Sequence, residues 1–211
     1  MSEQEVTNQF EIDGEVIQLD GDKATVKVIT EGANRKFEEL LVITVPPELI
    51  GSVKPGHLQS FAGQMKQGEE DEARETQLLA LDVQDAHGYF NFAKLLGEVW
   101  TVDFHSAKPK LGKKQFLNLF VKESGNENNG INTVAFRGLS ATLKDLARGS
   151  IVEMCGQVRR KAYSDGSGRY STDLILDPAK TDIIFEAKAR KLRKIGGQAD
   201  KKADKKAKKK V

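Results

Sequence analysis

Aromatic and basic side chains are interleaved along the middle of the sequence, between residues 94 and 170. Flat rings can stack on nucleobases and cations can contact phosphates, and this combination holds single-stranded nucleic acids in proteins. A stacked base is worth about 1–3 kcal/mol and needs no particular base sequence. The candidate residues are the aromatics Phe116, Phe136, Tyr163 and Tyr170 and the cations Lys94, Lys113, Lys114, Arg137, Arg159, Arg160 and Lys161.

Each candidate also has an ordinary structural explanation. Phe116, Phe120 and Trp100 occupy alternating strand patterns, which favours a place in the core for all three. For Tyr170, the core and a nucleic-acid contact are equally good explanations. The basic run at residues 159–161 would, on its own, form the solvated stem of a hairpin.

No pattern in the sequence points to an enzyme. There is neither a Gly-x-x-x-x-Gly-Lys phosphate-binding loop nor a Cys-x-x-Cys pair. The single cysteine, Cys155, and three scattered histidines are too few for a closed zinc site, and Cys155 is expected to be inert packing. The acidic run at residues 69–72 is typical of an exposed loop rather than of a paired acid and base. We therefore expect no catalysis, no cofactor and no metal.

The charge is divided sharply along the chain. Residues 1–88 carry 7 Lys and Arg against 18 Asp and Glu, a net charge of −11; residues 89–185 carry 14 against 10, a net of +4; and residues 186–211 carry 12 against 3, a net of +9. This asymmetry indicates an anionic partner for the basic part. The acidic segment should repel phosphates, so we expect it to contact protein. The alternatives are that it competes with nucleic acid for the basic face or is a degenerate copy kept for stability.

Apolar residues at alternate positions predict strands through most of the chain. The expected strands are 10–19, 24–30, 40–45, 58–65 and 78–83 in the first segment, and 90–102, 115–121, 131–136, 151–163 and 169–176 in the second, where the last two form a hairpin. A polar loop is predicted over 124–130. A short helix is predicted over 140–148, capped by Ser140 and ended by Gly149. From Phe185 a short basic helix is expected to lead into a disordered basic tail.

The two segments also repeat one another. A shift of 93 residues superposes Ile50, Val53, Gly56, Leu58, Gly63, Gln64 and Met65 on Leu143, Leu146, Gly149, Ile151, Gly156, Gln157 and Val158. A shift of 83 superposes Gly14-Glu15-Val16 on Gly97-Glu98-Val99. We therefore predict an all-β fold of two tandem five-stranded barrels, each with at most a short helix, with chance similarity as the alternative. The expected domains are 1–88, 89–185 and the basic tail 186–211.

Several stretches of the second segment follow one another in a characteristic order. They are Asn91-Phe92-Ala93-Lys94-Leu95-Leu96-Gly97, then Asn132-Thr133-Val134-Ala135-Phe136-Arg137, the helix at 143–148 with 149–153, Gly156-Gln157-Val158-Arg159, and the hairpin of 161–166 with 169–173. Over about ninety residues this ordered set resembles the bacterial single-stranded DNA-binding protein family, whose fold is the oligonucleotide-binding (OB) barrel. Any single stretch would be unspecific.

The resemblance implies OB-type barrels and non-enzymatic, sequence-independent binding of single-stranded DNA in replication, recombination or repair. It implies that Phe136 and Tyr163 stack on bases, because they occupy the family's aromatic positions. Replication or recombination proteins would be partners. Some relatives assemble two-barrel chains as dimers to reach four barrels, so a homodimer is expected.

Two departures separate this sequence from the family pattern. Gly130-Ile131 stand where the family usually carries another aromatic, so one stacking platform is expected to be missing. The chain ends in Lys208-Lys209-Lys210-Val211 instead of an acidic tip that recruits repair proteins. The tail is then a solubilising or non-specific phosphate-binding arm, and the protein a phage or mobile-element version.

Other functions remain open from the residues alone. Two barrels whose nucleic-acid face has decayed would form a protein-interaction scaffold, and an RNA-binding or primosome accessory protein is a third hypothesis. No apolar run is long enough to span a bilayer, and the acidic N-terminus lacks a secretion signal. With a lone cysteine, these features predict a cytoplasmic protein of a bacterial or phage-infected cell.

Overall fold

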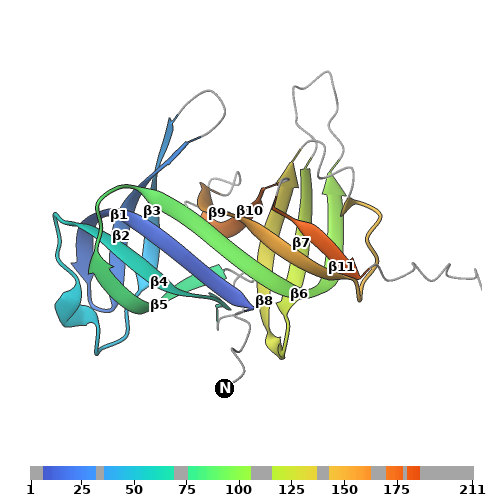
Figure 1. Ribbon diagram of the computed structural model, residues 1–211, viewed down its shortest axis with the longest axis horizontal. Coiled ribbons are helices and arrows are strands. Elements are labelled where there is room, and N and C mark those ends of the chain that lie inside the picture. The colour runs from blue at the N-terminus through green and yellow to red at the C-terminus, as the bar shows by residue number, and fades with distance from the viewer. Residues whose placement is uncertain are drawn as a thin grey trace, which may run out of the picture.

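The computed structural model describes residues 7–31, 36–68, 76–105, 116–136, 143–162, 170–177 and 180–185. In these residues the regular structure consists of eleven strands and one short 3-10 turn. Figure 1 shows the strands gathered into two neighbouring barrels, with the long strand β6 running from one toward the other.

The first barrel contains five strands. They are β1 (Asn8–Asp20), β2 (Lys23–Glu31), β3 (Lys36–Thr44), β4 (Leu58–Gln67) and β5 (Thr76–Asp85), with the 3-10 turn η1 (Ile50–Ser52) before β4. β1, β2 and β3 form an antiparallel meander, and β4 pairs antiparallel with both β1 and β5. Parallel pairing of β3 with β5 closes the barrel. Alternate side chains point inward, which leaves Ile12, Val26 and Phe61 fully buried.

The second barrel repeats this topology. Its strands are β6 (Phe90–His105), β7 (Phe116–Glu123), β8 (Asn126–Phe136), β9 (Ile151–Ala162) and β10 (Tyr170–Leu176). β6, β7 and β8 form the meander, β9 pairs with β6 and β10, and β10 pairs in parallel with β8. A sixth strand, β11 (Asp182–Phe185), adds to the edge of β9.

The two barrels use the same contacts at the shifts found in the sequence. The side-chain amide of Asn8 donates to the carbonyl of Met65 (2.6 Å) and its oxygen accepts from the Met65 amide (3.1 Å). Asn91, 83 residues later, makes the same pair of bonds with Val158, 93 residues after Met65, at 2.7 and 2.8 Å. Two identical bracing contacts agree with a duplicated barrel and are hard to explain by chance.

Close backbone packing requires glycine at one duplicated position. A Cβ added to Gly63 would lie 2.0 Å from the carbonyl oxygen of Leu79, and one added to Gly156 would lie 1.9 Å from that of Ile175. Each glycine lies on a strand that pairs with two others: β4 pairs with β1 and β5, and β9 pairs with β6 and β10. The strands approach closely there only because no side chain intervenes.

The barrels are joined by a strand pairing and by side chains. β1 and β6 run antiparallel, with Asn8 opposite Leu95 and Asp13 opposite Phe90, so all strands belong to one continuous sheet. Asn129 of β8 accepts from the amide of Gln67 (2.8 Å) and donates to the carbonyl of Met65 (3.0 Å). These bonds, together with the ladder, fix the barrels relative to one another.

Three local predictions are wrong or lie partly outside the described residues. The predicted loop at 124–130 is only a turn at Ser124 and Gly125, because residues 126–130 belong to β8, where Asn126 pairs with Glu123 and Gly130 with Lys122 of β7. Phe185 ends strand β11 instead of opening a helix. Residues 140–142 of the predicted helix lie outside the described residues, Leu143 is helical, and Lys144 and Asp145 already form a turn, with the Leu146 amide bonded to the Leu143 carbonyl.

Candidate nucleic-acid interface

Two of the predicted aromatic positions are brought together by the second barrel. Phe116 of β7 is the Cα partner of Phe136 in β8. Tyr170 opens β10 opposite Ala162, at the end of the hairpin that leads to Tyr163. Of these residues only the backbone is described, and Tyr163, like Lys113, Lys114 and Arg137, lies outside the described residues. Their roles therefore stay predictions.

The predicted cations on β9 follow one another along the hairpin stem. Arg159, Arg160 and Lys161 are the Cα partners of Asp173, Thr172 and Ser171 in β10. On the neighbouring strand β6, the ammonium of Lys94 lies 3.1 Å from a carboxylate oxygen of Glu153 on β9. Both side chains keep about a quarter of their surface exposed, so this pair is screened by water and contributes little to stability.

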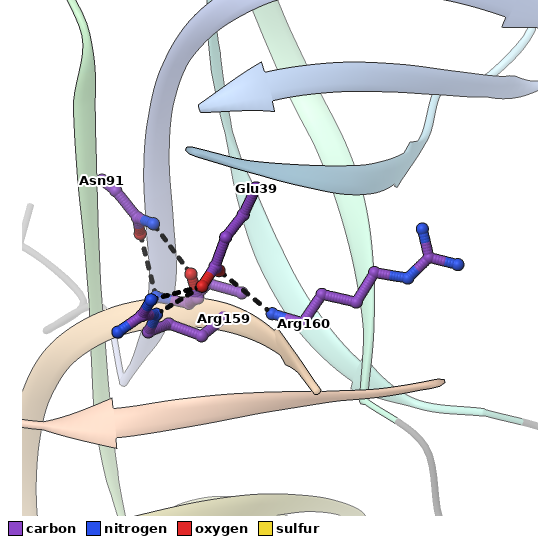
Figure 2. Close-up of polar contacts among 5 residues, drawn as sticks. Glu39, Asn91, Arg159 and Arg160 are labelled. Carbon is purple, nitrogen blue, oxygen red and sulfur yellow. Dashed lines mark hydrogen bonds and ion pairs between the residues drawn. The ribbon is translucent and has the colours of Figure 1, made fainter. Parts of the chain in front are cut away.

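Arg159 has a partner in the acidic barrel. Its Nε donates to Glu39 Oε1 at 2.7 Å, and its Nη2 donates to the same oxygen, while the other oxygen accepts from the Arg160 amide at 3.3 Å (Figure 2). The guanidinium also lies 4.3 Å above the ring of Phe37. Glu39 and Phe37 are both in β3. The first barrel therefore covers Arg159, a cation of the second barrel on the stem of its hairpin. In Figure 2 the side chain of Arg160 extends away from Glu39.

The glycine at the expected aromatic position has a structural cause. A Cβ on Gly130 would lie 1.9 Å from Cζ of Phe120, so the phenyl ring occupies the space that any side chain at 130 would need. Phe120 is 6% exposed, as its expected place in the interior requires. Position 130 therefore carries glycine because the ring of Phe120, from the neighbouring strand, fills the space beside it.

The core placement expected for Trp100 is wrong. Trp100 is half-buried and lies outside the core cluster, whereas Val99 beside it is fully buried. Its ring instead contacts Lys122 and Arg148, two cations that the sequence did not single out. The two cations are distant from Trp100 in the sequence, so their contact with the ring could not be predicted. The mixed polar and apolar composition of the strand was the one indication that Trp100 lies outside the core.

The described residues contain no candidate metal site, and their cysteine is buried. No group of three His, Cys, Asp or Glu side chains among them is arranged to hold a metal ion. Burial raises the pKa of the Cys155 thiol above its ordinary value, and the nearby carboxylate of Glu153 adds to this effect. The reactive thiolate is thus disfavoured, as a packing role requires. Among the same residues no helix is long and apolar enough to cross a membrane.

Comparison with solved structures identifies the fold. The single-stranded DNA-binding protein from Thermus aquaticus superposes with a TM-score of 0.65 at 16% identity, over 87% of this chain and 95% of that one. The chain shares the fold of that protein. A deletion variant of the same Thermus protein gives a TM-score of 0.62 at 15% identity, over 87% and 97% of the two chains. No protein-family model and no curated protein matches the sequence.

The match extends across both barrels and confirms two predictions. The fold is the all-β tandem of OB barrels, and the structural resemblance is to single-stranded DNA-binding proteins. At these identities the likeness concerns the fold, and the binding residues rest on this chain's own chemistry.

Proposed function

We propose that the protein binds single-stranded DNA without sequence preference through the second barrel, residues 89–185, and performs no chemical step. Phe136 and Tyr163 stack on bases, with Phe116 and Tyr170 as further aromatic candidates. The cations on the hairpin stem and on β6 contact phosphates. The protein would thus cover and protect exposed DNA in replication, recombination or repair.

One observation carries this proposal. The structure superposes over 87% of the chain on a single-stranded DNA-binding protein. The OB barrel holds single strands by stacking and charge, and this chain places aromatic positions on adjacent strands β7 and β8.

The distribution of charge supports the second barrel as the binding copy. Its net charge is +4 and that of the tail is +9, against −11 for the first segment. Electrostatic repulsion makes the first barrel a poor second site. Its contact with Arg159 through Glu39 favours competition for the basic face over the protein-contact role expected from sequence. A homodimer remains a prediction.

A salt series tests the proposal. The full chain is titrated with fluorescently labelled oligo-dT of about thirty nucleotides, longer than the roughly 4–16 nucleotides that one OB barrel covers. We expect the logarithm of the binding constant to fall linearly with that of the salt concentration, by about 0.7 for each phosphate neutralised. Removing residues 186–211 should flatten the slope if the tail touches phosphates. Absence of binding at low salt would favour the interaction scaffold.

A further inference from the structure

Trp100 is turned outward by a bulge in β6. The pairing of β6 with β7 shifts between Val99, which faces Val121, and Thr101, which faces Phe120. Trp100 is the extra residue between them. Bulges of this kind redirect a side chain and often stand beside functional sites. Here the bulge keeps the largest side chain of the strand outside the core and only half-buried.

Two cations lie against the half-buried indole. The ammonium of Lys122, on β7, is 3.8 Å from the ring centroid, and the guanidinium carbon of Arg148, in the turn before β9, is 3.1 Å from it. Each contact is favourable because the ring face is electronegative. Two like charges beside one ring repel each other, however, and an anion between them would relieve that repulsion.

The first barrel supplies an internal comparison. It has the same bulge between Val16 and Gln18, but the residue there is Ile17, 45% exposed. Opposite Glu15, the residue that corresponds to Glu98, stands Lys27, and these two form an ion pair. In the acidic barrel the bulge therefore carries no aromatic ring. The charge of Lys27 is neutralised by Glu15, its partner on the neighbouring strand.

In the basic barrel the lysine is used differently. Lys122 is the Cα partner of Glu98, as Lys27 is of Glu15, yet its ammonium lies over Trp100. At the shift of 93, Arg148 corresponds to Pro55, so the second cation is also particular to this copy. In the barrel whose net charge is positive, the bulge thus carries an aromatic ring with two cations beside it, where the first barrel has an isoleucine and a lysine paired with Glu15.

The cluster shares strands β6 and β7 with two of the proposed binding residues, Lys94 and Phe116. Trp100 is level with Phe120 on β7, which lies four residues along that strand from Phe116 and its partner Phe136. At about 3.3 Å per residue this is roughly 13 Å along the sheet. A single strand held at Phe136 could therefore continue across β7 to reach the indole.

We infer that Trp100 is a further base-stacking residue for single-stranded DNA, with Lys122 and Arg148 contacting the phosphates beside the stacked base. This inference rests on the proposed function. An arriving base displaces one cation from the ring, and the displaced cation meets the phosphate of that nucleotide. The site combines an aromatic platform with cations, which is what sequence-independent strand binding requires.

The inference is tested by fluorescence, because Trp100 is the only tryptophan of the chain. Oligo-dT of about thirty nucleotides is titrated while indole emission and the anisotropy of a labelled copy of the strand are followed in parallel. We expect the indole emission to be quenched and to saturate together with the anisotropy. Binding seen by anisotropy with unchanged indole emission would overturn the inference and leave the proposed function intact. No binding by either signal would overturn the proposed function as well.

Two variants complete the test. Trp100→Ile introduces the residue that the first barrel carries at this bulge, and we expect about tenfold weaker binding from the loss of one stacked base. Ile17→Ala is the matched control and should bind like the unaltered protein. The double variant Lys122→Gln and Arg148→Gln keeps the ring and should reduce the salt slope by about 1.4, that is 0.7 for each cation. Unchanged affinity in Trp100→Ile, with an unchanged melting temperature, contradicts the stacking role.

Discussion

Oligo-dT binds the double variant Phe136→Ala and Tyr163→Ala at least about thirtyfold more weakly than it binds the unaltered protein. Each ring is expected to hold one base, and each stacked base contributes about 1–3 kcal/mol, so the loss of both costs about 2 kcal/mol or more. The effect should be largely independent of salt, because no charge is removed. Anisotropy of a labelled strand measures it directly.

The control for this variant removes aromatic rings elsewhere. Tyr89 and Phe90 are 40% and 45% exposed and lie at the junction between the barrels, away from the paired positions of β7 and β8. Replacing both by alanine should leave the affinity within about twofold, since surface substitutions away from a site have small effects. If the Phe136 and Tyr163 variant also binds normally, stacking on this face is wrong and the interaction scaffold becomes the better account.

The largest loss of stability is expected at the glycine that β4 and β9 share, Gly63 in the first barrel and Gly156 in the second. Gly156→Ala places a Cβ 1.9 Å from the carbonyl oxygen of Ile175, a backbone atom that cannot move without parting β9 from β10. Overpacking of this kind costs about 1–3 kcal/mol, and we expect the upper end because the clash is with backbone. Gly63→Ala should behave alike in the first barrel, where the Leu79 carbonyl oxygen is 2.0 Å away.

Denaturant unfolding measures both glycine variants. Gly88→Ala is the matched control, because it lies between β5 and β6 with nothing within 4 Å of an added Cβ. It should unfold at the midpoint of the unaltered protein, whereas the other two unfold at lower denaturant. A Gly156→Ala variant with an unchanged midpoint would mean that the strands do not approach as closely as the structure has them.

The barrel strands were predictable because one face of each is buried. The alternation that places Ala93, Leu95 and Val99 inside is visible in the sequence, as is the repeat that indicates a second barrel. β11 was missed because its four residues show no alternation, and Ile183 and Ile184 are 38% and 58% exposed. An edge strand that buries few apolar side chains shows little hydrophobic periodicity, so it is hard to predict from the sequence.

Contacts between distant segments could not be predicted. Glu39 and Arg159 are 120 residues apart, and it is the pairing of the two barrels, through the β1–β6 ladder and the bonds of Asn129, that brings their strands together. Trp100 was assigned to the core by the alternation of its strand, but a bulge interrupts the period of two on which that prediction depends, and the bulge decides the side on which the indole lies. Its cations come from β7 and from the turn before β9.

A competition experiment tests the central claim, that the second barrel holds single strands by their exposed bases. Labelled oligo-dT bound to the full chain is challenged with unlabelled oligo-dT and, separately, with a duplex of equal length. Stacking needs free base faces, which a duplex hides, while the phosphates of both are accessible. We predict that the single strand displaces the label at concentrations at which the duplex leaves it bound. Equal displacement by the duplex would contradict the claim, because charge alone would then account for binding.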